Sequence, residues 1–323
     1  MQQAFPPDAP PVLALDVGGT KLAVAVVTAD GTTHGWQLAP TRREEGPEAV
    51  LKRLFELGHT AIEAAGTGPV AAVGISCGGP LDSAAGVLEC PPHLPGWVDV
   101  PIGALATEAF GAPAHLENDA TAGARAEHLF GAGAGVGTMV YLTVSTGIGG
   151  GAVIDGRLHH GSAGNGGEFG HVMVERGGRP CSCGRRGCVE AYASGSSIAE
   201  RAQEAVVDVT DSALARLDRV TAADVSRAAA QGDPLARRIW TETTDALGSA
   251  ITDLVNVFEP ELVVLGGGVT RSGSMLLDPI RTQVRRDAMG PAARTARIEL
   301  ARLGDAVCVV GAGAVALEQV SRG

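Results

Sequence analysis

Two distant segments of the chain carry the same order of features, and this repeat constrains the fold more than any other pattern. Residues 12–31 read as an apolar run, a glycine turn, a second apolar run and a closing Asp-Gly pair. Residues 139–156 repeat that order with weak sequence identity. Short apolar runs bounded by glycine and aspartate predict buried β-hairpins. The repeat therefore predicts a structural duplication with one such hairpin in each half.

Helical patterns and short strands follow each hairpin, which indicates two α/β lobes that divide near residue 119. Helices are predicted at residues 47–65, 102–110, 120–129, 189–206, 222–231, 234–258, 274–288 and from 310 onward. Further strands are predicted at residues 70–75, just before 116, and at 262–265 and 298–303. Residues 1–11 are expected to form a short disordered tail.

Composition and charge exclude several classes of protein. Of 323 residues, 45% are hydrophobic and 19% charged, a balance that fills a core and argues against disorder. The net charge of -11 disfavours nucleic acid and anionic membranes as partners. The N-terminal segment lacks the pattern of a secretory signal, and no uninterrupted apolar run is long enough to span a bilayer. Because three of the six cysteines cluster, we expect a cytoplasmic protein with a local metal site.

The first glycine turn has the composition of a phosphate-binding turn. Gly18 and Gly19 let backbone N–H groups approach an anion closely, and Thr20 and Lys21 add donors. Lys21 is one of only two lysines in the chain. Asp16, at the end of the preceding strand, is a candidate for orienting hydrated Mg²⁺. An ordinary tight hairpin is the alternative interpretation.

Two further glycine clusters extend this prediction to a nucleotide. Thr146 and Gly147 lie in the turn of the second hairpin, so two such turns would face each other and hold one triphosphate between the lobes. Gly266, Gly267 and Gly268 follow a strand, where adenine or ribose could lie against the backbone, although a plain loop is equally consistent. The chain has no G-x-x-x-x-G-K-[ST] loop, and no G-x-G-x-x-G opens a helix in the first unit. A Walker-type ATPase and a Rossmann dehydrogenase are therefore disfavoured.

Asp119 is the predicted catalytic base. It follows a strand at the predicted lobe boundary, where ligands bind in α/β proteins. A carboxylate there can accept the proton of a substrate hydroxyl that attacks a γ-phosphoryl group, while Asn118 fixes a sugar by hydrogen bonds. The alternative is that Asp119 only caps the following helix.

A cluster of one histidine and three cysteines predicts a closed, structural zinc site formed by His171, Cys181, Cys183 and Cys188. A disulfide with a spare thiol is the alternative. If one ring nitrogen of His171 binds zinc, the other is free to contact a substrate. The neighbouring carboxylates of Glu168 and Glu190 are either acceptors for vicinal sugar hydroxyls or ordinary surface groups.

With these residues assembled, the chain resembles the ROK family of sugar kinases and repressors over nearly its whole length. The resemblance rests on five motifs in order: Asp16-Val-Gly-Gly-Thr-Lys21, Glu117-Asn-Asp-Ala120, Ser145-Thr-Gly-Ile-Gly-Gly-Gly151, Glu168-Phe-Gly-His171 and Cys181-x-Cys-Gly-x-x-Gly-Cys-x-Glu190. It implies an actin-like, hexokinase-like (ribonuclease H-like) two-lobe α/β fold with duplicated mixed-sheet domains and a zinc-binding loop insertion at about residues 161–190. The small lobe would comprise residues 12–119 and about 304–323, and the large lobe residues 120–303.

The resemblance also implies roles for the site residues. Asp119 would be the base, and Mg-ATP would bind at Asp16 and the glycine turns. The implied sugar ligands are Gly79, Asn118, Glu168, His171 and Glu190. Family members are usually dimers or tetramers. Two features depart from the family pattern: His93 stands where the family has Asn in Pro-Asn-Leu-Pro-Gly-Trp, and residues 78–82 vary the glycine–proline sugar loop.

The expected function is ATP-dependent phosphorylation of the 6-hydroxyl of glucose, since residues 163–193 look most like the glucokinases of this family. An N-acetylmannosamine or N-acetylglucosamine kinase shares every motif and remains the alternative. Polyphosphate could replace ATP as the donor, although no basic track is evident in the sequence. A DNA-binding repressor is disfavoured because about eleven residues precede the first strand, too few for a helix-turn-helix unit. A non-catalytic sugar sensor is a further alternative.

Overall fold

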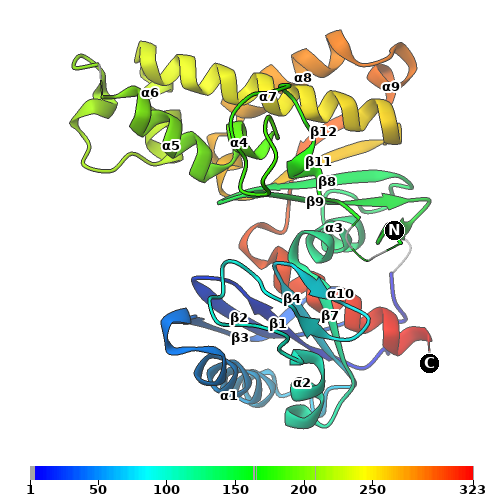
Figure 1. Cartoon of the computed structure of the whole chain (residues 1–323). Helices are drawn as coiled ribbons and strands as arrows, with labels where there is room; N and C mark the ends of the chain where they lie inside the picture. Colours follow the sequence, from blue (N-terminus) through cyan, green and yellow to red (C-terminus); the bar gives the residue numbers. More distant parts are fainter. Residues whose placement is uncertain (1–3, 163, 165, 208, 323) are drawn as a thin grey trace. The chain divides into compact units, whose positions relative to one another are not determined.

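The computed structural model describes residues 4–162, 164, 166–207 and 209–322, which form two compact units (Figure 1). Unit 1 takes its residues from 1–135, 158–166 and 302–323, and unit 2 from 136–157 and 167–301. The sequence places the division near residue 119. The first unit instead continues to Gly135, because the helix that begins at Asp119 packs on the C-terminal helix and its Arg125 pairs with Glu318.

Unit 1 is built on a five-stranded mixed sheet in the order β3-β2-β1-β4-β7. Its strands are β1 (Val12–Val17), β2 (Lys21–Val27), β3 (Thr33–Pro40), β4 (Val73–Cys77) and β7 (Ala114–Asn118). The β1–β2 pair is antiparallel, which confirms the first predicted hairpin, whereas β1, β4 and β7 run parallel. Because β1, β4 and β7 are parallel, their carboxyl ends lie at the same edge of the sheet. A separate two-stranded sheet joins β5 (Leu81–Asp82) and β6 (Val87–Leu88).

Helices cover both faces of the unit 1 sheet. They are α1 (Pro47–Ala65), α2 (Ile102–Phe110), α3 (Asp119–Phe130) and α10 (Val307–Arg322). Alternate residues of β1 face opposite sides, so Leu13 and Leu15 join the apolar cluster of α1 and α2 while Val12 and Ala14 join that of α10. Gly74 allows the close approach of α10, because a Cβ there would overlap the carbonyl of Ala312.

Unit 2 repeats the arrangement with a sheet in the order β10-β9-β8-β11-β12. Its strands are β8 (Met139–Val144), β9 (Ile148–Ile154), β10 (Arg157–Leu158), β11 (Leu262–Gly266) and β12 (Arg297–Leu300). Here too an antiparallel hairpin, β8–β9, adjoins two parallel strands. The predicted duplication is thereby confirmed.

The helices of unit 2 bury one large apolar cluster with β8 and β11. They are α4 (Glu190–Ala193), α5 (Gly195–Ala205), α6 (Ala222–Ala230), α7 (Pro234–Phe258), α8 (Ser274–Asp287) and α9 (Gly290–Thr295). The long α7, yellow in Figure 1, contributes Ile239, Leu247 and Ile251 to this cluster. Its bounds agree with the predicted helix, as do those of α1 and α2.

Three expectations from the sequence need correction. The predicted helix 189–206 is interrupted at Ser194, which is extended and caps α5 through its hydroxyl. The edge strand β3 was not predicted, because its residues are mostly half-exposed and lack a buried apolar run. The tail that was predicted to be disordered is anchored at one residue: Phe5 is buried, and its ring centroid lies 6.2 Å from that of Phe130, while most other described residues of the tail are exposed. Residues 1–3 lie outside the described residues.

One helical window, Gly304–Ser321, is long and apolar enough to cross a membrane by length and composition. It belongs almost entirely to α10, whose Val309, Ala312 and Leu317 are fully buried against β1 and its neighbours. The apolar character of this window is therefore that of a helix packed in the core.

Candidate functional site

The predicted site residues fall into two groups, one in each unit. The unit 1 group contains Asp16, at the carboxyl end of β1 beside Ser76 of β4. The Ser76 hydroxyl donates a hydrogen bond to Asp16 Oδ1 at 3.2 Å. Burial, together with the charge of Asp119, raises the pKa of Asp16 to about 7, against the opposing effects of Ser76 and Lys21. A buried and a half-buried carboxyl group, Asp16 and Asp119, thus share this edge of the sheet, a donor set that suits a hydrated divalent cation.

Asp119 is the first residue of α3, immediately after β7. The helix is capped by its neighbour: Asn118 Oδ1 accepts hydrogen bonds from the backbone N–H of Ala120 at 3.0 Å and of Thr121 at 3.3 Å. Asp119 Oδ1 accepts from the backbone N–H of Ala120, at 2.8 Å. Burial raises the pKa of Asp119, and the Ala120 hydrogen bond and His93 partly oppose that shift. The capping role therefore belongs mainly to Asn118.

The glycine–proline loop lies beside this pair. A Cβ at Gly79 would stand 3.7 Å from the amide nitrogen of Asn118, so the loop and the helix cap are neighbours. This places two of the predicted sugar ligands, Gly79 and Asn118, within one part of unit 1.

His93 lies between two glycine turns, a position that the sequence did not predict. Its Nε2 is 3.8 Å from Cys77 Sγ, and a Cβ at Gly78 would stand 2.7 Å from its Cε1. On the other side, a Cβ at Gly19 would stand 3.1 Å from the His93 carbonyl oxygen. Burial lowers the pKa of His93, while Asp119 opposes that shift. The only sequence signal was the departure from the family's Asn.

The first glycine turn has the geometry of a tight hairpin and keeps its side-chain donors exposed. Gly18 N–H donates to the Lys21 carbonyl at 3.0 Å, and the Thr41 hydroxyl donates to the Gly18 carbonyl at 2.6 Å. Thr20 and Lys21 are exposed. The hairpin interpretation and the phosphate-turn interpretation are therefore compatible.

The turn of the second hairpin is fixed to the start of α5. The Ser145 carbonyl accepts from Gly195 N–H at 2.7 Å, and the Thr146 carbonyl accepts from the Ser196 hydroxyl at 2.6 Å. Gly147 also lies close to Glu190, since a Cβ there would stand 2.8 Å from Glu190 Oε2. These contacts hold the predicted phosphate turn in a defined conformation.

The third glycine cluster ends β11. Gly267 has φ 88°, a conformation that favours glycine, and a Cβ there would overlap the backbone of Val144. Gly268 faces open space, since no heavy atom lies within 4 Å of a Cβ built there. The cluster therefore brings bare backbone to the carboxyl ends of β8 and β11, beside Gly266.

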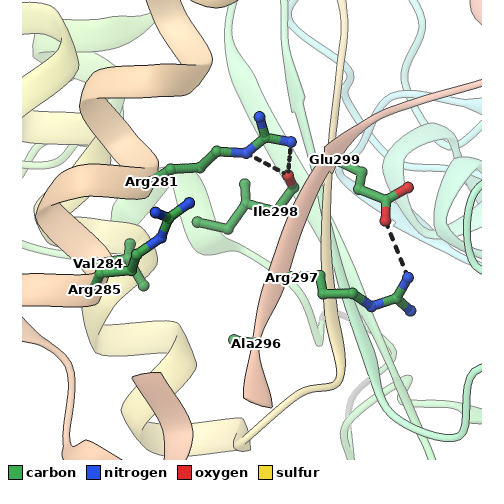
Figure 2. A pocket seen from close by; sticks show the side chains of 7 residues that line it. All are labelled: Arg281, Val284, Arg285, Ala296, Arg297, Ile298 and Glu299. Atoms are coloured by element: carbon green, nitrogen blue, oxygen red, sulfur yellow. Dashed lines mark hydrogen bonds and ion pairs between the residues drawn. The ribbon is translucent and has the colours of Figure 1, made fainter. Parts of the chain in front are cut away.

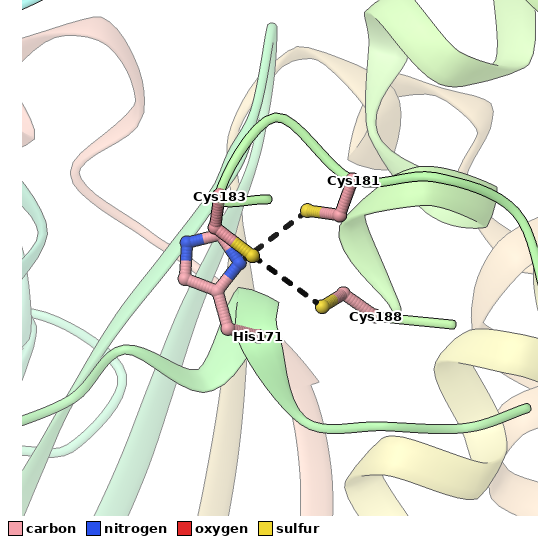
Figure 3. Close-up of side chains that lie close together, drawn as sticks. All are labelled: His171, Cys181, Cys183 and Cys188. Atoms are coloured by element: carbon pink, nitrogen blue, oxygen red, sulfur yellow. Dashed lines mark hydrogen bonds between the residues drawn. The ribbon is translucent and has the colours of Figure 1, made fainter. Parts of the chain in front are cut away.

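The predicted zinc ligands lie together in unit 2 (Figure 3). The ligand atoms of His171, Cys181, Cys183 and Cys188 all lie within 4.8 Å of one another. The Sγ atoms of Cys183 and Cys188 are 3.8 Å apart, and Cys181 Sγ is 3.6 Å from His171 Nδ1. Tetrahedral zinc with its usual bond lengths would separate two sulfurs by about 3.8 Å and a sulfur from a nitrogen by about 3.5 Å. The donor set and its spacing both fit zinc, and all the cysteines are free.

Glu168 and Glu190 lie next to this cluster on opposite sides. His171 Nε2 is 3.7 Å from Glu168 Oε2, while the other ring nitrogen faces Cys181. Glu190 Oε2 accepts from Ile148 N–H at 2.9 Å, and its Oε1 accepts from the Ser182 hydroxyl at 3.1 Å. Glu190 therefore links the second glycine turn to the cysteine loop.

Comparison with known proteins identifies the family. Residues 12–319 match the model of the ROK family. The chain belongs to the ROK family. A glucokinase of Thermotoga maritima is 34% identical over 96% of this chain and 98% of the relative. The ROK hexokinase from Thermus thermophilus has a TM-score of 0.84 at 36% identity, covering 97% of this chain and all of that one. The ROK glucokinase from Streptomyces griseus, solved with glucose and AMPPNP, has a TM-score of 0.78 at 32% identity over 95% and 99% of the two chains.

A relative that is named for another sugar has a comparable identity over a smaller share of the chain. An N-acetylmannosamine kinase of Shigella flexneri is 36% identical over 80% of this chain and 83% of the relative. Identity alone therefore does not distinguish between sugars.

Proposed function

We propose that the protein is an ATP-dependent sugar kinase that phosphorylates the 6-hydroxyl of glucose. The observation that carries the proposal is the state of Asp119, a half-buried carboxyl group with a raised pKa at the start of α3, whose helix is already capped by Asn118. Asp119 is not needed as the helix cap, and its removal from water raises its pKa. A carboxyl group with these two properties is suited to act as a general base. Relatives named as glucokinases, one solved with glucose and AMPPNP, support this assignment.

The proposed mechanism gives each group of residues one task. Asp119 accepts the proton of the sugar hydroxyl as its oxygen attacks the γ-phosphorus, and the bond to the bridging oxygen of ADP breaks. The proposed sugar ligands are Gly79 and Asn118 in unit 1, and Glu168, His171 and Glu190 in unit 2. The glycine turns at residues 18–21, 146–147 and 266–268 bind the nucleotide. Mg²⁺, when bound, neutralises phosphate charge, and Asp16 is the residue that would hold its hydration shell.

Zinc has a structural role in this proposal. His171, Cys181, Cys183 and Cys188 would hold the ion, and no ligand position would remain for substrate. The ion would fix the ring of His171 so that Nε2 stays beside Glu168, where both side chains can reach a sugar. We further propose that the enzyme works in the cytoplasm as a homodimer or homotetramer.

An N-acetylmannosamine kinase is the second candidate, supported by the Shigella flexneri relative. Turnover of ATP with glucose, mannose, fructose, N-acetylglucosamine and N-acetylmannosamine separates the two. A kcat/KM for glucose at least tenfold above that for each N-acetyl sugar supports the glucokinase, and the reverse order supports the second candidate. The same panel run with polyphosphate tests the alternative donor.

A further inference from the structure

Arginines gather around two adjoining hollows on the surface of unit 2. The first hollow has a volume of about 270 Å³ and lies between α8 and β12, with Arg281, Arg285 and Arg297 in its lining (Figure 2). The second is lined by Arg285, Arg286 and Arg294. Because both hollows share Arg285 and Ala296, they form one continuous surface, which we call the arginine groove.

The arginine groove is separate from the glycine turns of the same unit. Those turns follow the carboxyl ends of β8 and β11. Strand β12 runs parallel to β11 and begins at Arg297, so Arg297 and Ala296 lie at the opposite, amino edge of the sheet. The remaining arginines of the groove come from the last turns of α8 and from α9.

The charge of the groove runs against that of the whole chain. Residues 281–297 contain five arginines and one acid, Asp287, in a protein with a net charge of -11. Arginines so close together repel one another, and an overall acidic composition gives no reason for them to gather in one place. The cluster therefore points to a negatively charged ligand.

Internal partners neutralise only part of this charge. Arg286 pairs with Asp287, and Arg297 donates to Glu299, which also lines the groove, at 3.1 Å. Figure 2 shows the Arg281 guanidinium held by the Ile298 carbonyl, at 3.0 and 2.7 Å. Arg281 Nη1 also pairs with Asp278 Oδ1 at 3.8 Å. Arg285 and Arg294 are exposed and have no hydrogen bond or ion pair among the residues that the structure describes.

We propose that the arginine groove binds a small phosphorylated anion, either free phosphate or a phosphoester. A guanidinium group presents paired N–H donors that match phosphate oxygens, and Arg285 and Arg294 have those donors available. Arg281, oriented by Ile298 and paired with Asp278, lies at the other end of the groove. Since this surface is at the amino edge of the sheet, the bound anion would be an effector and not the phosphoryl donor. The inference does not depend on the sugar that the enzyme uses.

Titration calorimetry of the full-length protein tests the proposal. Phosphate, diphosphate and glucose 6-phosphate are titrated separately at one fixed ionic strength into wild type and into Arg285→Ala/Arg294→Ala. The two lost guanidinium groups should weaken binding of at least one of these anions about tenfold or more. The order of the three affinities distinguishes free phosphate from a phosphoester as the ligand.

Two further variants make the result specific. Arg219→Ala/Arg238→Ala removes the same charge from two other exposed arginines that have no ion pair within the described part of the chain, and it should bind like wild type. Arg285→Lys/Arg294→Lys keeps the charge without the paired donors and should fall in between. Three results would each overturn the proposal. They are equal affinity in wild type and the Arg285/Arg294 double variant, an equal loss of affinity in both double Ala variants, and no saturable binding of any anion to wild type.

Discussion

The Ser76 hydroxyl lies 3.2 Å from Asp16 Oδ1 and joins the ends of β4 and β1 in unit 1. Ser76 is thus the side-chain donor to a carboxyl group whose pKa burial raises to about 7. Asp16 therefore holds a proton in the folded protein at pH values where an unfolded aspartate, with a pKa near 3.8, is charged.

The raised pKa of Asp16 predicts a pH dependence of stability in protein freed of divalent cations. At pH values between the unfolded pKa of Asp16, 3.8, and its folded pKa, about 7, the native state binds more protons than the unfolded state. The contribution of Asp16 to the free energy of unfolding is therefore largest at low pH and is lost as pH rises through about 7. Urea unfolding at several pH values from 4 to 8 measures it. In Asp16→Asn this component should vanish, and identical pH profiles for the two proteins would contradict the assigned pKa.

Asp119→Asn should abolish turnover while sugar affinity stays within about tenfold, because the positioning contacts survive the loss of the base. The melting temperature should not fall, since Asn118 still caps α3 and a partly desolvated carboxyl group is removed. Asn118→Ala is the contrasting variant: loss of the cap should cost about 1 kcal/mol of stability. A destabilised but active Asp119→Asn enzyme would make Asp119 a structural residue.

The pKa of Asp119 also sets the acid limb of activity. A base must be charged to accept a proton, and burial raises the pKa of this carboxyl above its ordinary 3.8. We expect kcat/KM for the sugar to fall on acidification with a midpoint above that of an ordinary aspartate. A pH–rate profile from 4 to 9 checks this, and activity that remains level down to pH 4 would be inconsistent with Asp119 as the base.

Cys183→Ser should release the metal. One equivalent of zinc is expected in wild type and in Cys90→Ser, which removes an exposed cysteine outside the cluster. The Cys183 variant should lose the zinc and raise the sugar KM or unfold the loop, because His171 is no longer fixed. Metal content is measured by atomic emission. Unchanged zinc in Cys183→Ser would refute the ligand assignment.

Glu127 carries a prediction that no sequence motif suggested. This fully buried carboxylate of α3 accepts from the backbone N–H groups of Ala132, Arg302 and Leu303 at 2.8 to 2.9 Å. Glu127→Gln replaces one acceptor oxygen by a donor that faces an N–H group, so we expect a loss of about 1–3 kcal/mol in the free energy of unfolding. Glu63→Gln, at an exposed position of α1, should be neutral. Equal stability of the two variants would show that these hydrogen bonds contribute nothing.

Sequence patterns predicted the elements of this fold better than its contacts. The hairpins, α1 and α7 follow from local periodicity, and the His171–Cys188 cluster follows from ligand spacing within one loop. Ser194 carried a usable signal, since serine is a strong helix cap, yet the surrounding apolar pattern obscured the break. The positions of Phe5, His93 and Glu127 could not be predicted, because each depends on a partner far away in the sequence. The same is true of the arginine groove, which needs α8, α9 and β12 to be folded together.

The most direct test of the central claim is ATP consumption by the zinc-retaining protein, measured with each sugar of the panel beside Asp119→Asn. The account predicts turnover with glucose above that with every other sugar, and none in the variant. Turnover that persists in Asp119→Asn, or no turnover of ATP with any sugar by the wild-type protein, would contradict it.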